Sequence, residues 1–234
     1  MPSSETPVPS SETTGPSSET PGLETPIEGL RSAPPSQLPY QAGVLVRSFL
    51  LERPTGNVIV YNSPGLTSAA THIRDAGGAA RLLVNHAHEA MYGDPDLDAP
   101  VFVHERDRSE TARSMLVAGV FTGRQLIDDD LEVIPTPGHT PGTTSYLWDS
   151  GSHRFLFTGD FIWIENGEWK AVVLGSSLRA EYLHSLALVR ELDFDVLVPW
   201  GTTEGGPCFA LADRAEIVAR VDAIIARVES GGDR

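Results

Sequence analysis

The chain has 234 residues, of which 40% are hydrophobic, and its formal net charge is -15. This length is enough for one well-buried domain, and no run of about 18 apolar residues exists that would span a membrane. Because an acidic surface repels phosphate backbones, we expect a small-molecule substrate and no nucleic-acid partner. The single cysteine, Cys208, excludes an internal disulfide framework and predicts a reducing, cytoplasmic environment.

Residues 1–40 differ in composition from everything that follows. The pentapeptide PSSET occurs at 2–6, 9–13 and 16–20, and no apolar residue recurs with it. Proline, serine, threonine and glutamate without packing side chains cannot offset the entropy lost on ordering. The sequence therefore predicts a disordered tail over 1–40 and one folded domain over 41–234.

The first half of this domain alternates between strand and helix patterns. In chain order the predicted elements are two strands within 43–65 joined by a turn at 54–57, a helix at 68–78, a strand at 80–85, a strand at 99–105 and a helix at 108–119.

The second half is rich in strand patterns and ends in helices. Its predicted strands are 131–138, 143–149, 153–160 and 168–174, followed by a helix at 179–192, a strand at 195–200 and a long C-terminal amphipathic helix. Two β-rich segments that are each accompanied by helices predict two sheets packed face to face with helices outside. The expected fold class is therefore α/β, as a four-layer αββα sandwich.

Seven histidines are present, and four of them stand in ordinary surroundings. His72 and His184 lie in predicted helices, and His153 lies beside a predicted turn, so these three are expected at the surface or in packing roles. His104 ends a predicted strand, and it remains a candidate to line a cleft.

The other three histidines and one aspartate have the chemistry of a metal site. His86 and His88 follow an apolar strand in LLVNHAH, where strands commonly deliver ligands to a cleft. His139 lies in the tight loop TPGHTPG, and Asp160 ends FLFTGD. Imidazole nitrogens and carboxylate oxygens are ligands of divalent metals. Taken singly, each residue also fits an ordinary role, such as a turn for an aspartate after Thr-Gly.

In this order and context, LLVNHAH, VIPTPGHTPGTTSYLWD and FLFTGD resemble the metallo-β-lactamase-fold hydrolase superfamily. The resemblance covers roughly residues 41–230. It implies the αββα fold, and it implies that His86, His88, His139 and Asp160 are the metal ligands.

The chain departs from the family pattern in three places. Ala90 and Met91 stand at the aspartate and histidine positions of the first motif, and VLVPWGT, with Trp200 and Gly201, replaces the closing PGHG. Asn62 stands where the opening hairpin usually has an acidic residue. The resemblance therefore implies a single ion rather than two.

Two metal chemistries follow from the resemblance. In the first, His86, His88 and His139 hold one zinc, and Asp160 completes the coordination or deprotonates a water that attacks a small ester, thioester, amide or lactone. In the second, His86, His139 and Asp160 hold one iron, as in the related persulfide dioxygenases.

A third possibility is a degenerate, non-catalytic member that binds a small molecule or a partner. In that protein Met91 and Trp200 would fill the vacated site or line an apolar ligand pocket. Whether Glu89 or Asp94 replaces a missing ligand is left open by the sequence.

Overall fold

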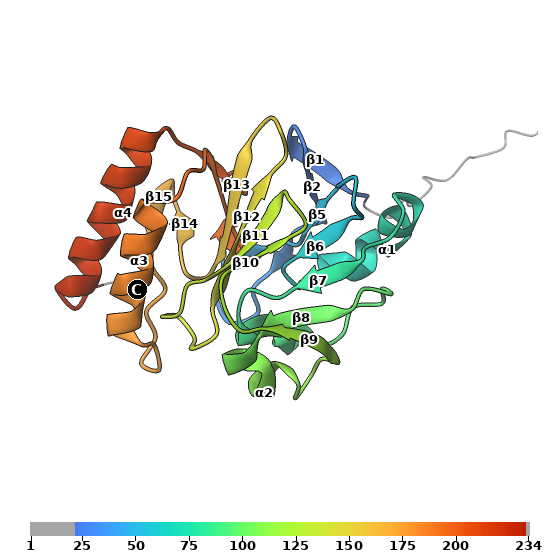
Figure 1. Ribbon diagram of the computed structural model, residues 1–234, viewed down its shortest axis with the longest axis horizontal. Coiled ribbons are helices and arrows are strands. Elements are labelled where there is room, and N and C mark those ends of the chain that lie inside the picture. The colour runs from blue at the N-terminus through green and yellow to red at the C-terminus, as the bar shows by residue number, and fades with distance from the viewer. Residues whose placement is uncertain (1–21, 233–234) are drawn as a thin grey trace, which may run out of the picture.

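The computed structural model describes residues 22–232, which form three β-sheets and the helices around them (Figure 1). The first sheet has seven strands in the order β1-β2-β5-β6-β7-β8-β9. Their bounds are β1 Glu24–Ile27, β2 Leu30–Ser32, β5 Phe49–Leu51, β6 Val58–Val60, β7 Arg81–Leu83, β8 Val101–His104 and β9 Val117–Phe121.

The second sheet has six strands in the order β10-β11-β12-β13-β16-β18, and the third has five in the order β15-β14-β17-β4-β3. The bounds of the second are β10 Gln125–Ile127, β11 Leu131–Pro135, β12 Thr144–Asp149, β13 Arg154–Gly159, β16 Val196–Pro199 and β18 Ala210–Leu211. Those of the third are β3 Ser36–Gln37, β4 Val44–Val46, β14 Trp163–Glu165, β15 Glu168–Lys170 and β17 Gly201–Thr203.

Four α-helices and two short 3-10 helices complete the described part of the chain. They are α1 Gly65–Asp75, η1 Ala87–Tyr92, η2 Glu105–Asp107, α2 Arg108–Thr111, α3 Arg179–Arg190 and α4 Arg214–Glu229. In Figure 1, α3 and α4 lie together on one side of the sheets, and α1 lies on the opposite side. No helix within residues 22–232 is both long and apolar enough to cross a membrane.

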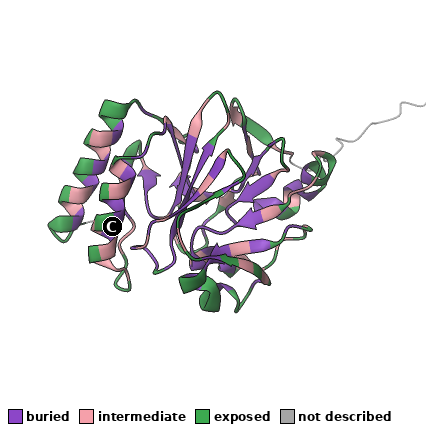
Figure 2. Ribbon diagram, viewed as in Figure 1, coloured by how far each residue is buried: buried purple, intermediate pink, exposed green. Residues whose placement is uncertain are grey.

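The alternation of side chains along the strands produces the layers. On β13, Phe155 and Phe157 pack into the core between the first and second sheets, whereas Leu156 packs toward α3 and α4. On β6, Val58 and Val60 enter the same central core, and Ile59 packs toward α1. Figure 2 shows the buried residues concentrated on these strands and on the inner sides of the helices. This is the αββα arrangement predicted from the sequence.

Several predicted elements are present as expected. The helix α1 ends where the glycines were expected to stop it, because Gly77 and Gly78 have φ angles of 100° and 73° that L-residues with side chains rarely adopt. The Gly78 amide donates to the Ile73 carbonyl at 2.8 Å, which satisfies an end of the helix. The C-terminal helix buries its apolar stripe at Ile217, Val221, Ile224 and Val228.

Two other predicted elements are wrong in part. Residues 43–51 form two strands rather than one, since β4 pairs with β17 in the third sheet while β5 pairs with β6 in the first. The helix predicted over 108–119 ends at Thr111, and Val117–Phe121 forms β9. Parallel pairing with β8 gives this segment a partner that a local helical pattern does not reveal.

The expectation of a disordered tail over 1–40 is wrong for residues 22–40, which contribute β1, β2 and β3; residues 1–21 lie outside the described part of the chain. The strand β2 pairs with β5, and Leu30 is fully buried in the central core. Leu38 is buried in the same core. Buried leucines and strand pairing therefore offset the conformational entropy that residues 22–40 lose on ordering. The polar composition of the segment had suggested that this entropy cost would keep it disordered.

If Leu30 belongs to the core, Leu30→Ala should lower the free energy of unfolding by about 2–5 kcal/mol, because it removes buried methyl groups and leaves a cavity. The matched control is Leu126→Ala, since Leu126 is 61% exposed; its effect should stay within about 0.5 kcal/mol. Urea unfolding followed by circular dichroism measures both. Equal effects of the two substitutions would contradict the placement of residues 22–40 in the core.

Candidate metal centre

The structure brings together all four predicted site residues at the ends of strands from two facing sheets. His86 and His88 follow β7, His139 lies in the loop between β11 and β12, and Asp160 directly follows β13. One nitrogen from each histidine lies within 4.8 Å of the others, so the three histidines form a group able to hold a metal ion. Asp160 Oδ2 is 3.5 Å from His86 Nε2 and 3.8 Å from His139 Nε2.

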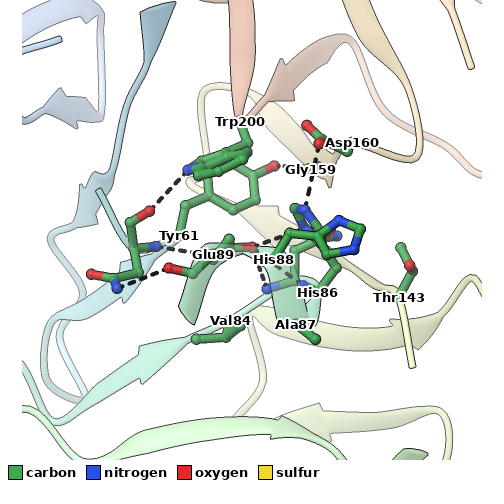
Figure 3. A network of polar contacts seen from close by, with 12 residues as sticks. Tyr61, Val84, His86, Ala87, His88, Glu89, Thr143, Gly159, Asp160 and Trp200 are labelled. Carbon is green, nitrogen blue, oxygen red and sulfur yellow. Dashed lines mark hydrogen bonds and ion pairs between the residues drawn. The ribbon is translucent and has the colours of Figure 1, made fainter. Parts of the chain in front are cut away.

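The ring of His86 is oriented by its neighbour Asn85. Its Nδ1 lies 3.0 Å from Asn85 Oδ1, which can only accept, so Nδ1 carries the donated proton. The Asn85 amide nitrogen in turn donates to the Thr144 carbonyl. This leaves His86 Nε2 facing Asp160, with which it forms an ion pair at 3.5 Å (Figure 3). The nitrogen is buried and makes no hydrogen bond within the described residues. A buried nitrogen left in this way suits a metal ligand.

His139 and His88 present their nitrogens to the same place. His139 Nδ1 donates to the Val172 carbonyl at 2.7 Å, which fixes the ring and leaves Nε2 without a proton. That Nε2 lies 3.0 Å from His88 Nδ1, within hydrogen-bond distance. Three oriented imidazoles therefore converge, and each has a nitrogen aimed at a common point.

The protonation states of the three histidines and Asp160 favour the binding of a cation. Burial, together with the nearby charge of His86, lowers the pKa of His88 and of His139 to about 4, so both are neutral at pH 7. Burial also disfavours the charged form of His86, but Asp160 and Glu89 outweigh it and raise the His86 pKa to about 10. Burial raises the pKa of Asp160, but the histidines overcome it and hold that pKa below its usual value. The protein thus keeps one positive charge beside Asp160, and a bound metal ion supplies that charge when it replaces the proton.

Glycine is required where the two sheets meet behind His86. Gly159, the glycine of the TGD motif, has a φ angle of 59°, and a Cβ there would lie 1.9 Å from Asn85 Oδ1. A larger residue would displace the amide that orients His86, so this glycine and Asp160 serve the same site from adjacent positions.

The buried carboxylate of Asp107 joins the two histidine loops. It accepts hydrogen bonds from the Ala87 amide at 2.9 Å, from the Gly142 amide at 2.7 Å and from the Thr140 hydroxyl. Ala87 lies between His86 and His88, whereas Thr140 and Gly142 belong to the loop of His139. One side chain therefore fixes the spacing of ligands that are far apart in the sequence.

A cavity of about 700 Å³ opens over the cluster. His88, His139 and Asp160 lie in its lining, and most of the other lining side chains are apolar. Tyr40, whose side chain is largely exposed, also lines it. The size is that of a small-molecule site.

The sequence pattern of the family described as the metallo-beta-lactamase superfamily matches residues 67–201. The chain belongs to this superfamily. No curated protein sequence matches the chain. Membership of the superfamily and the histidine cluster together indicate metal-dependent chemistry of the hydrolase type.

Solved structures of metallo-β-lactamases share the fold. DIM-1 metallo-β-lactamase matches with a TM-score of 0.68 at 16% identity, over 92% of this chain and 100% of that one. GOB-18 from Elizabethkingia meningoseptica matches with a TM-score of 0.58 at 14% identity, over 97% of both chains. A metallo-β-lactamase family protein from Thermus thermophilus matches with a TM-score of 0.60 at 18% identity, over 87% of this chain and 80% of that one. At such identities the likeness establishes the fold alone.

Other residues stand in this chain at the positions where the family pattern has further metal ligands. Trp200 is buried, its ring lies 5.3 Å from the His86 ring, and its Nε1 donates to the Asn62 carbonyl at 2.9 Å. Trp200 therefore packs against the histidine cluster. This agrees with the interpretation that it fills the vacated site. Met91 instead is 45% exposed and lines the cavity. Ala90 and Gly201 also line the cavity and carry no ligand atom.

Neither Glu89 nor Asp94 replaces a lost ligand in this arrangement. The buried Glu89 carboxylate accepts from the amides of Asn62 at 2.7 Å and Asn85 at 2.8 Å, and it lies on the opposite side of His86 from Asp160 (Figure 3). Asp94 accepts from the Leu116 amide at 2.9 Å. Both carboxylates are held by backbone donors and are absent from the cavity lining.

The remaining histidines lie outside the cluster. His104 is buried and accepts from the Arg106 amide at 3.2 Å, where it caps η2 instead of lining the cavity. His153 pairs with Asp195 at 2.6 Å beside the β12–β13 turn. His72 and His184 are exposed on α1 and α3, as expected.

Sequence reasoning missed Asn85 and Asp107. Asn85 directly precedes the first histidine, so its position in LLVNHAH was a usable signal for a residue that orients His86. Asp107 follows HER in a polar stretch, and no local pattern distinguishes it from the neighbouring surface charges. Its role depends on a loop more than thirty residues away.

If Asp107 sets the spacing of the ligands, Asp107→Ala should weaken zinc binding at least about tenfold, since partners outside the ligand set tune affinity by such factors. Competition with a chromophoric chelator on folded protein measures the affinity. The matched control is Asp130→Ala, because Asp130 also accepts several hydrogen bonds, from Arg53 and Trp148, but away from the cluster. An unchanged affinity in Asp107→Ala, or an equal loss in the control, would refute this role.

Proposed function

We propose that this metallo-β-lactamase-fold protein is a hydrolase that uses one zinc ion to cleave a small ester, thioester, amide or lactone. His86, His88 and His139 would hold the ion, with Asp160 beside it. The observation that carries the proposal is the convergence of three imidazole nitrogens, one of which, His86 Nε2, is buried without a hydrogen-bond partner among residues 22–232.

The donor set fits one ion and does not fit two. Three imidazoles with an open fourth position are the ligand set of catalytic zinc, and His86 would give up its proton when the ion binds. A second ion would rely on Asp160 alone, because Ala90 and Gly201 supply no ligand atom and Trp200 packs against His86. Asp160 already lies beside His86, and a single carboxylate is too few ligands to hold a second ion tightly.

When bound, zinc supplies a Lewis acid that polarises a carbonyl and lowers the pKa of a water from 15.7 to about 7. In hydrolysis, water adds its hydroxyl to the carbonyl carbon and its proton to the leaving group. The bond between the carbonyl carbon and the leaving group breaks. Asp160 Oδ2, at 3.5 Å and 3.8 Å from two of the ligand nitrogens, would hold the attacking water and take its proton. His86 and His139 keep their orientation through Asn85 and Val172.

Metal analysis of protein purified without a histidine tag tests this proposal. Plasma mass spectrometry should find about one zinc per chain, lost in His139→Ala and retained in His184→Ala, because His184 is exposed on α3.

Met91→His restores one family ligand but should leave the stoichiometry near one, since Ala90 and Gly201 are unchanged. Asp160→Asn should lower the turnover of a responsive ester on the order of 10²–10⁴-fold.

Each other outcome of that analysis contradicts a part of the proposal. Two tightly bound ions in Met91→His would refute the single-ion site. Iron in place of zinc would favour the iron-dependent oxygenase. No metal after reconstitution would leave the non-catalytic binding protein as the better account.

A further inference from the structure

We propose that the part of the substrate remote from the reacting bond is uncharged and apolar, and that it lies in the cavity over the histidine cluster. This inference rests on the proposed function, and it adds the substrate class. The cavity of about 700 Å³ is large enough for a side chain of several carbons beyond the bond that is cleaved.

Most of the cavity wall is apolar. Val44 and Val46 of β4 and Leu38 before it are part of the lining. Val172 and Leu174, which follow β15, and Met91 of η1 extend this surface. Apolar groups gain free energy by leaving water for such a surface, whereas a charged group would lose its hydration there without compensation.

The charges around the cavity disfavour an anionic tail. Arg113 is a cation in the lining, but it lies 2.6 Å from Glu110, which also lines the cavity. The pair is therefore neutral as a unit. The whole chain has a net charge of -15, so an incoming anion meets repulsion.

Large apolar side chains are exposed where the cavity opens. Met91 is 45% exposed and Leu174 39%, and both line the cavity. Tyr40, at 65% exposed, adds an aromatic ring with a hydroxyl to the same lining. Grouped exposure of this kind marks a binding surface more often than isolated exposed leucines do. Their common position over the cluster indicates that they bind the substrate.

Three p-nitrophenyl esters test the inference with the zinc-loaded protein: acetate, hexanoate and the anionic glutarate half-ester. The hexanoate should have a kcat/KM on the order of 100-fold above that of the acetate, because its extra methylene groups are buried. The glutarate half-ester, of similar length, should be no better than the acetate. Leu174→Glu should reduce the gain at least tenfold, whereas Leu126→Glu, on the remote strand β10, should leave it unchanged.

Binding of the uncleaved amides acetamide and hexanamide, followed by nuclear magnetic resonance, separates this inference from hydrolysis itself. Esters that are cleaved without a chain-length preference would overturn the inference and leave the proposed function standing. A preference for the glutarate half-ester that is lost in Arg113→Ala would overturn it as well.

The same measurements can also support the apolar site while contradicting the hydrolase. If no ester is cleaved but hexanamide binds more tightly than acetamide, and Leu174→Glu removes the difference, the apolar site stands and the hydrolase falls. Neither cleavage nor a difference in amide binding would overturn both.

Discussion

The arrangement of the site depends on the burial of three imidazoles and a carboxylate within a few ångströms of one another. Such a group is unstable in a protein interior unless its charges are balanced and its polar atoms have partners. Here the pKa values of His88 and His139 fall to about 4, and that of His86 rises to about 10 beside Asp160. One positive charge is therefore retained where the nitrogens of the three histidines converge. A divalent ion satisfies that requirement better than a proton, because it binds all three nitrogens at once.

The surrounding fold holds this group in place through hydrogen bonds to side chains and to the backbone. Asn85 and the Val172 carbonyl orient two of the rings, and Asp107 ties the two loops that carry them. Gly159 lets the second sheet approach Asn85 closely. These residues lie in or shortly after strands of all three sheets, so the packing of the sheets also determines the geometry of the site. The third sheet adds the wall of the cavity through β4 and the segment after β15.

Much of the fold and the four central residues were predictable because they rest on local signals. Short apolar runs on either side of a turn identified β12 and β13, and paired glycines ended α1. The order of His86, His88, His139 and Asp160 in their motifs carried the resemblance to the superfamily. The failures have the opposite origin: β2 and β9 depend on pairing with distant strands, and the role of Asp107 depends on a loop that only folding brings near. The positions of Met91 and Trp200 also needed the structure, since one lines the cavity and the other packs on His86.

Under the proposed function the site holds one ion, and the positions of further ligands in the family pattern hold other residues. Trp200 packs against His86, and the residues around the opening leave an apolar cavity beside a single cluster of donors. The central claim is thus one ion held by three histidines. Anomalous diffraction at the zinc absorption edge from crystals of the zinc-loaded protein tests it most directly. One peak within bonding distance of His86, His88 and His139 is the predicted result. Two adjacent peaks, or none at the cluster, would contradict the account.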